Sequence, residues 1–170
     1  LSAAQRQTTI PTERRFKSLK LGIDELFQFP FVVMTGEAAF QLTAKERENL
    51  RNYLQKGGFL LASAGGSSEE WDRCFRREIQ QVFGREGVTK IPMTHPVFTT
   101  VKAIGSLKLS HGGGDAQLEG LELNVKLVAI HSRHGLNDTA HTEGCCCCGG
   151  NEIANALEVM VNIFVYALLH

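Results

Sequence analysis

The chain has 170 residues, a length that suits one domain, and its 43% of hydrophobic residues are enough for a packed core. Charged residues make up 21%, the usual share of a globular protein, which argues against a disordered chain. Because 18 basic residues balance 18 acidic ones, the composition also argues against nucleic acid as a partner, which would require a basic surface.

No run of apolar residues in the sequence is long enough to span a bilayer. The longest, Val159 to Leu169, is interrupted by Asn162 and predicts a buried helix instead. At the other end, residues 1–20 are polar and basic and are expected to form an irregular, solvated arm. The chain begins at Leu1 without a signal segment, which fits either a processed, exported or periplasmic protein or a trimmed sequence.

In the first part of the chain, local patterns predict a strand followed by a helix. The apolar, β-branched run 31–35 predicts a buried strand that ends at the following glycine. Thr43 and Glu46 form a capping-box pattern, which predicts a helix start. Gly57 and Gly58 predict the end of that helix, since glycine accepts the left-handed conformation of a helix C-cap.

A second strand and helix are predicted next. Strand 59–62 leads into small residues, and Ser67 with Glu70 repeats the capping-box pattern. The helix that follows, up to Phe83, has its apolar residues on one stripe. Cys74 lies on this stripe and is therefore expected to be a small core residue.

The second half of the chain has weaker patterns. Residues 88–91 and 126–130 predict further strands, and the glycine-rich stretch 105–120 between them predicts a loop. Residues 131–151 predict a polar loop rich in glycine, histidine and cysteine. Asn151 is expected to cap a last helix that is apolar on most sides and largely buried, through Ile153, Leu157, Met160, Val161, Phe164 and Leu168.

This order of elements predicts a single α/β domain over residues 1–170. Strands that alternate with helices favour a three-layer sandwich, in which helices cover both faces of a mainly parallel sheet, as in flavodoxin-like folds.

Short motifs follow one another over most of the chain. They are FPFVVMTG at 29–36, LRNYL at 50–54 with GGFL at 57–60, FRRE at 75–78, HPVF at 95–98 and VNIFVYAL at 161–168. In this order and spacing they resemble a bacterial family known as the domain of unknown function DUF4159. The resemblance implies a fold like that of class I glutamine amidotransferases and brings no established activity with it.

The resemblance also implies differences in this chain. Members of the family often begin with an extra strand and helix, so their first strand is expected to be missing or altered here. After the second strand, where the family leads us to expect an acidic residue, the chain has Ser63 followed by Ala64, Gly65 and Gly66. The run Cys145 to Cys148 is not a feature that we associate with the family as a whole.

The turn after strand 59–62 is the first candidate site. Amidotransferase-like enzymes carry a catalytic cysteine at such a turn, where a helix N-terminus stabilises a thiolate. This chain has no cysteine there, and Ser63 is the alternative nucleophile, with His95 or His131 as its base. The sequence lacks the first glycine of a G-x-S-x-G elbow, so the turn can equally be a small-residue loop packed under a helix start.

The same turn can bind a small ligand without reacting with it. Gly65, Gly66 and Ser67 precede a predicted helix N-terminus, where free N–H groups attract an anion. Open α/β sheets bind ligands at the carboxyl ends of their strands, which is where the predicted fold places this turn.

The loop 131–151 is the second candidate site. Its imidazole and thiolate groups are the ligands of zinc and of copper, so we expect one of these metals to be bound by His131, His134, His141, Cys145 and Cys148. The side chains of four consecutive cysteines diverge, so two or three can reach one ion, and a binuclear site is an alternative. A flexible loop with idle or oxidised thiols is another. A reduced cysteine run favours a reducing compartment, in conflict with export.

Two further groups of residues attract attention. His95, with His111 and Asp115, is expected either to cap the next turn or to line a pocket. The charged residues of the helix up to Phe83 are expected to form a solvated face, with recognition of an acidic partner as the alternative: Asp72, Arg73, Arg76, Arg77 and Glu78.

The sequence therefore favours a non-catalytic binding domain that holds zinc or copper in its His/Cys loop. The alternatives are a hydrolase, which would use Ser63 with a histidine or a metal held by the histidines, and a protein-interaction module of an envelope complex. The last rests on fold-level analogy alone.

Overall fold

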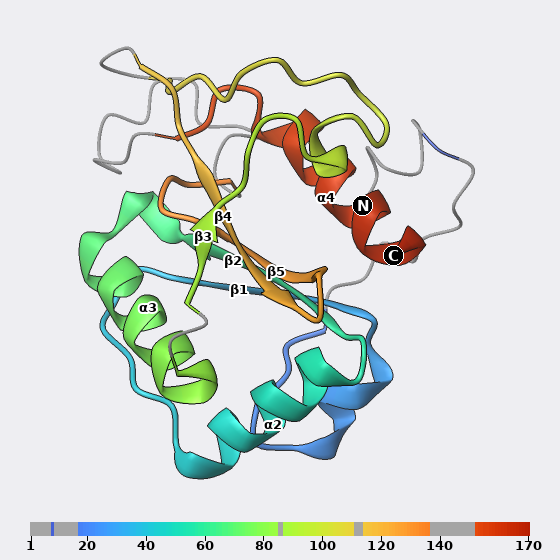
Figure 1. The fold of residues 1–170 in the computed structure, drawn as a ribbon. Helices are drawn as coiled ribbons and strands as arrows, with labels where there is room; N and C mark the ends of the chain where they lie inside the picture. Colours follow the sequence, from blue (N-terminus) through green and yellow to red (C-terminus); the bar gives the residue numbers. More distant parts are fainter. Residues whose placement is uncertain (1–7, 9–16, 85–86, 111–113, 137–151) are drawn as a thin grey trace.

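The computed structural model describes residues 8, 17–84, 87–110, 114–136 and 152–170. A five-stranded open sheet lies between helices α2 and α3 on one face and helix α4 on the other, so the fold is mixed α/β in three layers (Figure 1). The elements in chain order are η1 Asp24–Gln28, β1 Phe31–Gly36, α2 Ala44–Gln55, β2 Phe59–Ala64, η2 Gly65–Ser67, α3 Glu69–Phe83, β3 Thr89–Lys90, η3 Pro96–Phe98, β4 Leu118–Leu123, β5 Lys126–Ser132 and α4 Ala156–Leu169.

The sheet is mixed, whereas a mainly parallel sheet was expected. Its strand order is β1-β2-β5-β4-β3. The pairings β1–β2 and β2–β5 are parallel, and the pairings β5–β4 and β4–β3 are antiparallel. The antiparallel half arises from a hairpin between β4 and β5, whose turn residues Asn124 and Val125 have φ values of 51° and 65°. Positive φ at both positions is what a two-residue hairpin turn of type I′ requires.

The predicted start and end of α2 are confirmed. The backbone N–H of Glu46 donates to Thr43 Oγ1 at 3.2 Å, and the backbone N–H of Thr43 donates to a carboxylate oxygen of Glu46 at 2.8 Å. At the other end Gly57 has a φ of 97°, so the helix ends at a position that favours glycine.

The cap of α3 lies one residue later than the sequence pattern predicts. The backbone N–H of Trp71 donates to Ser68 Oγ at 3.2 Å, so Ser68 is the N-cap and Ser67 precedes it. Gly66 and Ser67 have φ values of 53° and 55°. Because Ser67 is part of this left-handed turn, the helix is capped one residue later, at Ser68.

Helix α4 differs from its prediction in two ways. It begins at Ala156 after Asn155, while Asn151 lies outside the described residues. It is also less buried than its apolar sequence predicts, because Leu157 is 55% exposed and Leu168 is 37% exposed. Among the described residues, no helix combines the length and apolar character needed to cross a membrane.

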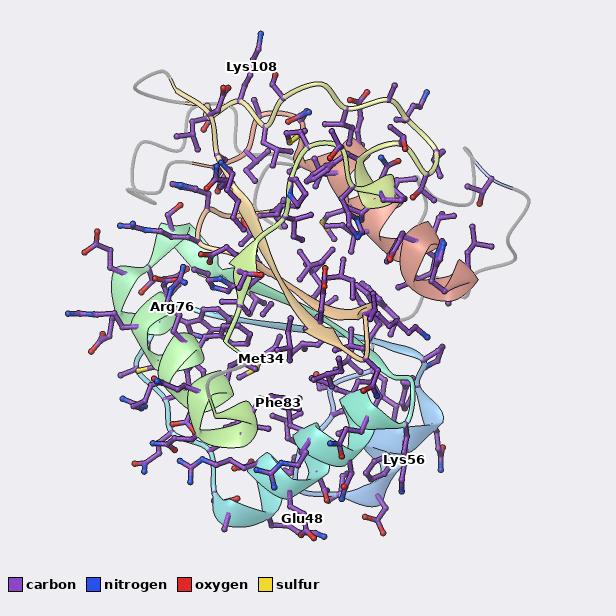
Figure 2. All side chains as sticks on the ribbon, in the orientation of Figure 1. Met34, Glu48, Lys56, Arg76, Phe83 and Lys108 are labelled. Carbon is purple, nitrogen blue, oxygen red and sulfur yellow. The ribbon has the colours of Figure 1, made fainter. Side chains whose placement is uncertain are left out.

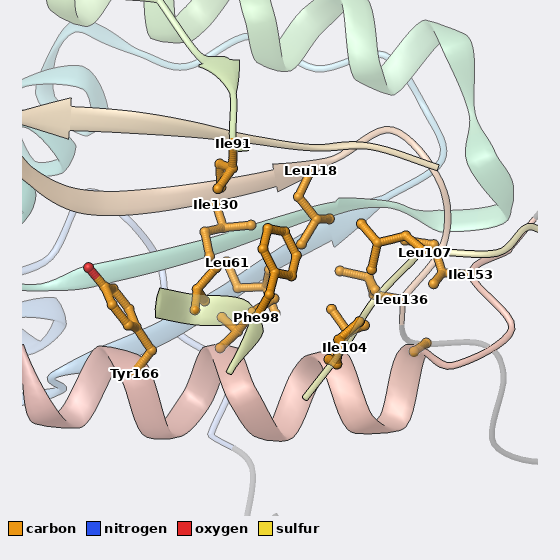
Figure 3. Close-up of a cluster of buried hydrophobic side chains, with 14 of the residues drawn as sticks. Leu61, Ile91, Phe98, Ile104, Leu107, Leu118, Ile130, Leu136, Ile153 and Tyr166 are labelled. Atoms are coloured by element: carbon orange, nitrogen blue, oxygen red, sulfur yellow. The ribbon is translucent and has the colours of Figure 1, made fainter. Parts of the chain in front are cut away.

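The core consists of two main clusters, one on each face of the sheet. Figure 3 shows the cluster on the α4 side, where Phe98 of η3 packs between Leu61 of β2, Ile130 of β5 and the helix. The cluster on the other side joins α2 and α3 to the opposite face of the strands. Cys74 is 5% exposed on this second side, which confirms that it is a buried residue of α3.

Candidate functional site

The three parallel strands end at the same edge of the sheet. Gly36 at the end of β1 pairs with Ala64 at the end of β2, and Ser63 pairs with Ser132 at the end of β5. The segments that follow these strands therefore start side by side. This carboxyl edge is where open α/β sheets bind ligands.

Hydrogen bonds tie these segments together. The backbone N–H of Leu136 donates to Ser63 Oγ at 3.1 Å, and the backbone N–H of Gly135 approaches Ser67 Oγ at 3.4 Å. On the other side of the turn, Ser68 Oγ donates to the carbonyl oxygen of Glu37 at 2.6 Å. The two sites predicted separately from the sequence, the turn Gly65–Ser67 and the start of the His/Cys loop, thus lie against each other.

Ser63 is positioned as a structural residue rather than beside a base. It is 1% exposed, and its oxygen accepts the N–H of Leu136. His131 pairs with Ala62, so its side chain points to the α2–α3 face, whereas Ser63 points to the α4 face. The structure therefore does not bring Ser63 and His131 together.

Among the described residues, no hydrogen bond joins His95 to Ser63. Its ring lies 5.4 Å from the ring of Tyr166, which lies 6.3 Å from the ring of Phe59 at the first position of β2. Ser63 stands four residues further along β2, about 13 Å away at the rise of a strand. His95 instead caps η3, because its Nδ1 accepts the backbone N–H of Val97 at 3.2 Å, as the simpler of its two predicted roles requires.

His131 belongs to a buried polar cluster that the sequence did not reveal. Its Nδ1 lies 3.1 Å from Glu119 Oε2 of β4, and its Nε2 lies 3.1 Å from Asp72 Oδ1 of α3, close enough for an ion pair but outside hydrogen-bond geometry. The ring stacks on Phe75 with the centroids 4.7 Å apart, and it is fully buried. Each ring nitrogen thus faces a carboxylate oxygen.

Arg76 completes the cluster. Its side chain, labelled on α3 in Figure 2, donates to Asp72 at 3.1 Å and, through two guanidinium nitrogens, to Glu119 of β4 at 3.1 and 2.6 Å. Two carboxylates thus share one guanidinium and one imidazole ring in one place. We call these four residues, Asp72, Arg76, Glu119 and His131, the buried ionic cluster.

The solvated face expected for α3 is therefore wrong for part of the helix. Asp72 is 7% exposed and Glu78 is 1% exposed. Glu78 lies 2.8 Å from Arg47 of α2 and 3.2 Å from Arg77. The pair with Arg47 joins α3 to α2, while Arg73 and Arg77 remain on the exposed side. The spacing of charged residues along α3 could not predict this burial. It depends on Glu119 of β4, which lies in a region predicted as a loop.

The cluster sets the ionisation of its carboxyl groups. Burial acts to raise the pKa of Asp72, but His131 and Arg76 outweigh it and lower that pKa from 3.8 to about 2. The pKa of Glu119 is lowered in the same way: its burial is outweighed by His131 and Arg76.

We therefore expect acid to destabilise the fold through Asp72. A depressed folded-state pKa means that the charged carboxylate stabilises the fold above pH 3.8, and that this contribution is lost as the pH falls through about 2. Thermal unfolding followed across this range should show a steeper loss of midpoint temperature in the wild type than in Asp72→Asn. Equal slopes would show that Asp72 contributes nothing to the acid sensitivity.

The predicted metal ligands lie partly outside the described residues. His141, Cys145 and Cys148 fall in the range 137–151, which lies outside the described residues. His111, which was grouped with His95, lies in a second such range, 111–113. His134 is half-buried beside the carboxyl edge, where its carbonyl oxygen accepts a hydrogen bond from Ser132 Oγ at 2.6 Å. Within the described part of the chain, no group of three or more His, Cys, Asp or Glu side chains could hold a metal ion. Asp115, which was also grouped with His95, is exposed, and its backbone forms an isolated antiparallel β-bridge with that of Lys108.

A comparison with protein families finds one match over nearly the whole chain. The model of a domain of unknown function, DUF4159, matches residues 1–168, which confirms the family that the sequence motifs resemble. No curated protein matches the sequence.

Proposed function

The chain belongs to the DUF4159 family, and we propose that it is a non-catalytic binding domain whose ligand site lies at the carboxyl edge of β1, β2 and β5. The proposal is carried by one observation, the hydrogen bonds that hold Gly135 and Leu136 against the turn after β2. A small anionic ligand at this edge would lie against Gly65, Gly66 and Ser67. Ser63 and His131 point to opposite faces of the sheet, and His95 Nδ1 accepts the N–H of Val97, which supports binding over serine-dependent hydrolysis.

We further propose that the loop leaving this edge binds zinc or copper. Its donors fit these metals, since imidazole and thiolate are the ligands that both prefer. His131 does not fit as a ligand of this metal, because its two ring nitrogens already face the carboxylates of Asp72 and Glu119. The ligands that we propose are therefore His134, His141, Cys145 and Cys148, with His131 fixing the strand end from which the loop leaves.

A fold of the flavodoxin-like or glutamine amidotransferase-like kind is part of the same proposal. It is supported by the three parallel strands with helices on both faces. The β4–β5 hairpin is a departure from an all-parallel sheet, and it places Glu119 beside His131.

Elemental analysis of the untagged protein as purified tests the metal. We expect zinc or copper near one ion per chain in the wild type and little in a variant with both Cys145→Ser and Cys148→Ser. Cys74→Ala is the matched control, because it removes a buried thiol of α3 outside the loop. Metal-free wild type, or equal metal loss in the control, would contradict the proposal.

A further inference from the structure

A cavity lies at the edge of the sheet opposite to the carboxyl edge. Its volume is about 590 Å³, which is within the range of small-molecule sites. It is lined by residues 54–57 at the end of α2 and by Leu123, Asn124, Lys126 and Val128 of the β4–β5 hairpin. Figure 1 shows the end of α2 beneath this hairpin, on the side where β2 and β5 begin. A ligand here would therefore bind independently of one at the turn after β2.

The lining combines an apolar wall with two cationic groups. Leu54 and Val128 are 1% and 4% exposed and belong to the core cluster on the α2–α3 face, so they form the apolar part of the wall. Lys56 and Lys126 are exposed, and none of the eight described residues that line the cavity is acidic. A molecule with an anionic group and an apolar body would match both parts of this lining.

The surroundings of Lys56 favour an anion beside it. Its Nζ lies 5.2 Å from the centroid of the Phe27 ring, and this cation–π contact holds the ammonium group at the end of α2. A helix C-terminus repels anions through its free carbonyl groups. At the end of α2, however, the carbonyl oxygens of Asn52, Tyr53 and Leu54 all accept backbone N–H groups. The repulsion is therefore reduced, and the lysines dominate the charge beside the cavity.

The hairpin turn beside the cavity is strained in a way that the fold does not require. Val125 stands between the lining residues Asn124 and Lys126, has a φ of 65° and is 97% exposed. A β-branched residue rarely adopts this conformation, and a type I′ turn favours glycine there. Because its side chain is exposed, Val125 gains almost no packing within the chain that would offset the strain. Strained residues concentrate at ligand sites, and this valine offers apolar surface next to the cavity.

We propose that this cavity binds a small amphipathic anion, a molecule with a carboxylate or phosphate group on an apolar body. The anionic group is bound by the ammonium groups of Lys56 and Lys126. The apolar body lies against Leu54 and Val128, and Val125 adds a contact from the turn. This site is additional to the ligand site at the carboxyl edge and does not depend on it.

Titration with octanoate, followed by the chemical shifts of the backbone amides, tests the site. We expect saturable shifts at Gln55, Gly57, Asn124 and Lys126, with a dissociation constant of about 1 mM, as suits a ligand of about ten heavy atoms. Octyl phosphate should shift the same amides, and the tighter of the two ligands identifies the anionic group. Octanol has the apolar body without the charge and should bind at least roughly tenfold more weakly.

Substitutions separate the contributions to binding. Lys56→Gln and Lys126→Gln should each raise the dissociation constant of octanoate roughly fivefold. Lys108→Gln is the matched control, because this exposed lysine lies at the opposite end of the molecule from Lys56 (Figure 2), and it should bind like the wild type. Val125→Gly should weaken binding roughly threefold without lowering the thermal midpoint, since glycine relieves the strain. Three results would each overturn the proposal: no shifts up to about 10 mM octanoate, shifts confined to the turn 65–67, or lysine variants that bind like the wild type.

Discussion

Replacing His131 by leucine should lower the free energy of unfolding by about 3–5 kcal/mol. Leucine fits the apolar side of the site, against Phe75, but it removes a group that both carboxylates of the buried ionic cluster face. Asp72 and Glu119, whose side chains are 10% and 23% exposed, would then share the single guanidinium of Arg76. Urea unfolding at neutral pH measures the loss.

A second substitution separates this charge effect from lost packing. Asp72→Asn in the His131→Leu background removes the excess negative charge, so the double variant should be more stable than the sum of the two single losses predicts. A double-mutant cycle should give a coupling of about 1–3 kcal/mol, since the two side chains are neighbours in one network. Strictly additive losses would show that the carboxylate and the imidazole act independently.

His131 also shows where prediction from local patterns ends. Its residue type and its distance from His134 pointed to a metal ligand, because the apolar run 126–130 appeared to end before it. In the structure β5 continues to Ser132, and a side chain two positions after Ala129 points to the same buried face. Alternation along the strand was the available signal. The partners Asp72 and Glu119 come from other elements and had no local signal.

The missed strand β4 has a similar explanation. Its sequence, Leu118–Leu123, alternates apolar and acidic residues only in part, and its pairing with β5 shifts register between Leu121 and Glu122. Gly120 in the middle suggested a loop, but a side chain there would collide with Leu127 of the partner strand, so this glycine serves a close approach. Elements with strong caps and stripes, such as α2 and α3, were predictable because their signals are local. The mixed sheet was not, since it depends on pairing at a distance.

Little in the sequence indicated the role of Asn162. Its replacement by leucine is expected to cause the second large decrease in the free energy of unfolding. In the sequence it is an interruption of an apolar run. In the structure it is 1% exposed, its Oδ1 accepts the backbone N–H groups of Val101 and Lys102 at 3.1 and 2.9 Å, and its Nδ2 donates to the carbonyl of Lys102 at 2.8 Å. The amide thus fastens the chain after η3 to α4.

Leucine at position 162 would leave these three backbone groups without their partner. Each unsatisfied buried group costs about 1–3 kcal/mol, but Lys102 is exposed and water can replace part of the loss, so we expect a decrease of about 2–4 kcal/mol in the free energy of unfolding. Amide exchange at Val101 and Lys102 should accelerate in native conditions, a local effect that lost packing alone would not produce. Glu158→Ala, an exposed change on the same helix, should stay within about 0.5 kcal/mol of the wild type. Unchanged exchange at both amides in Asn162→Leu would show that the chain after η3 is held by its packing against α4 rather than by this side chain.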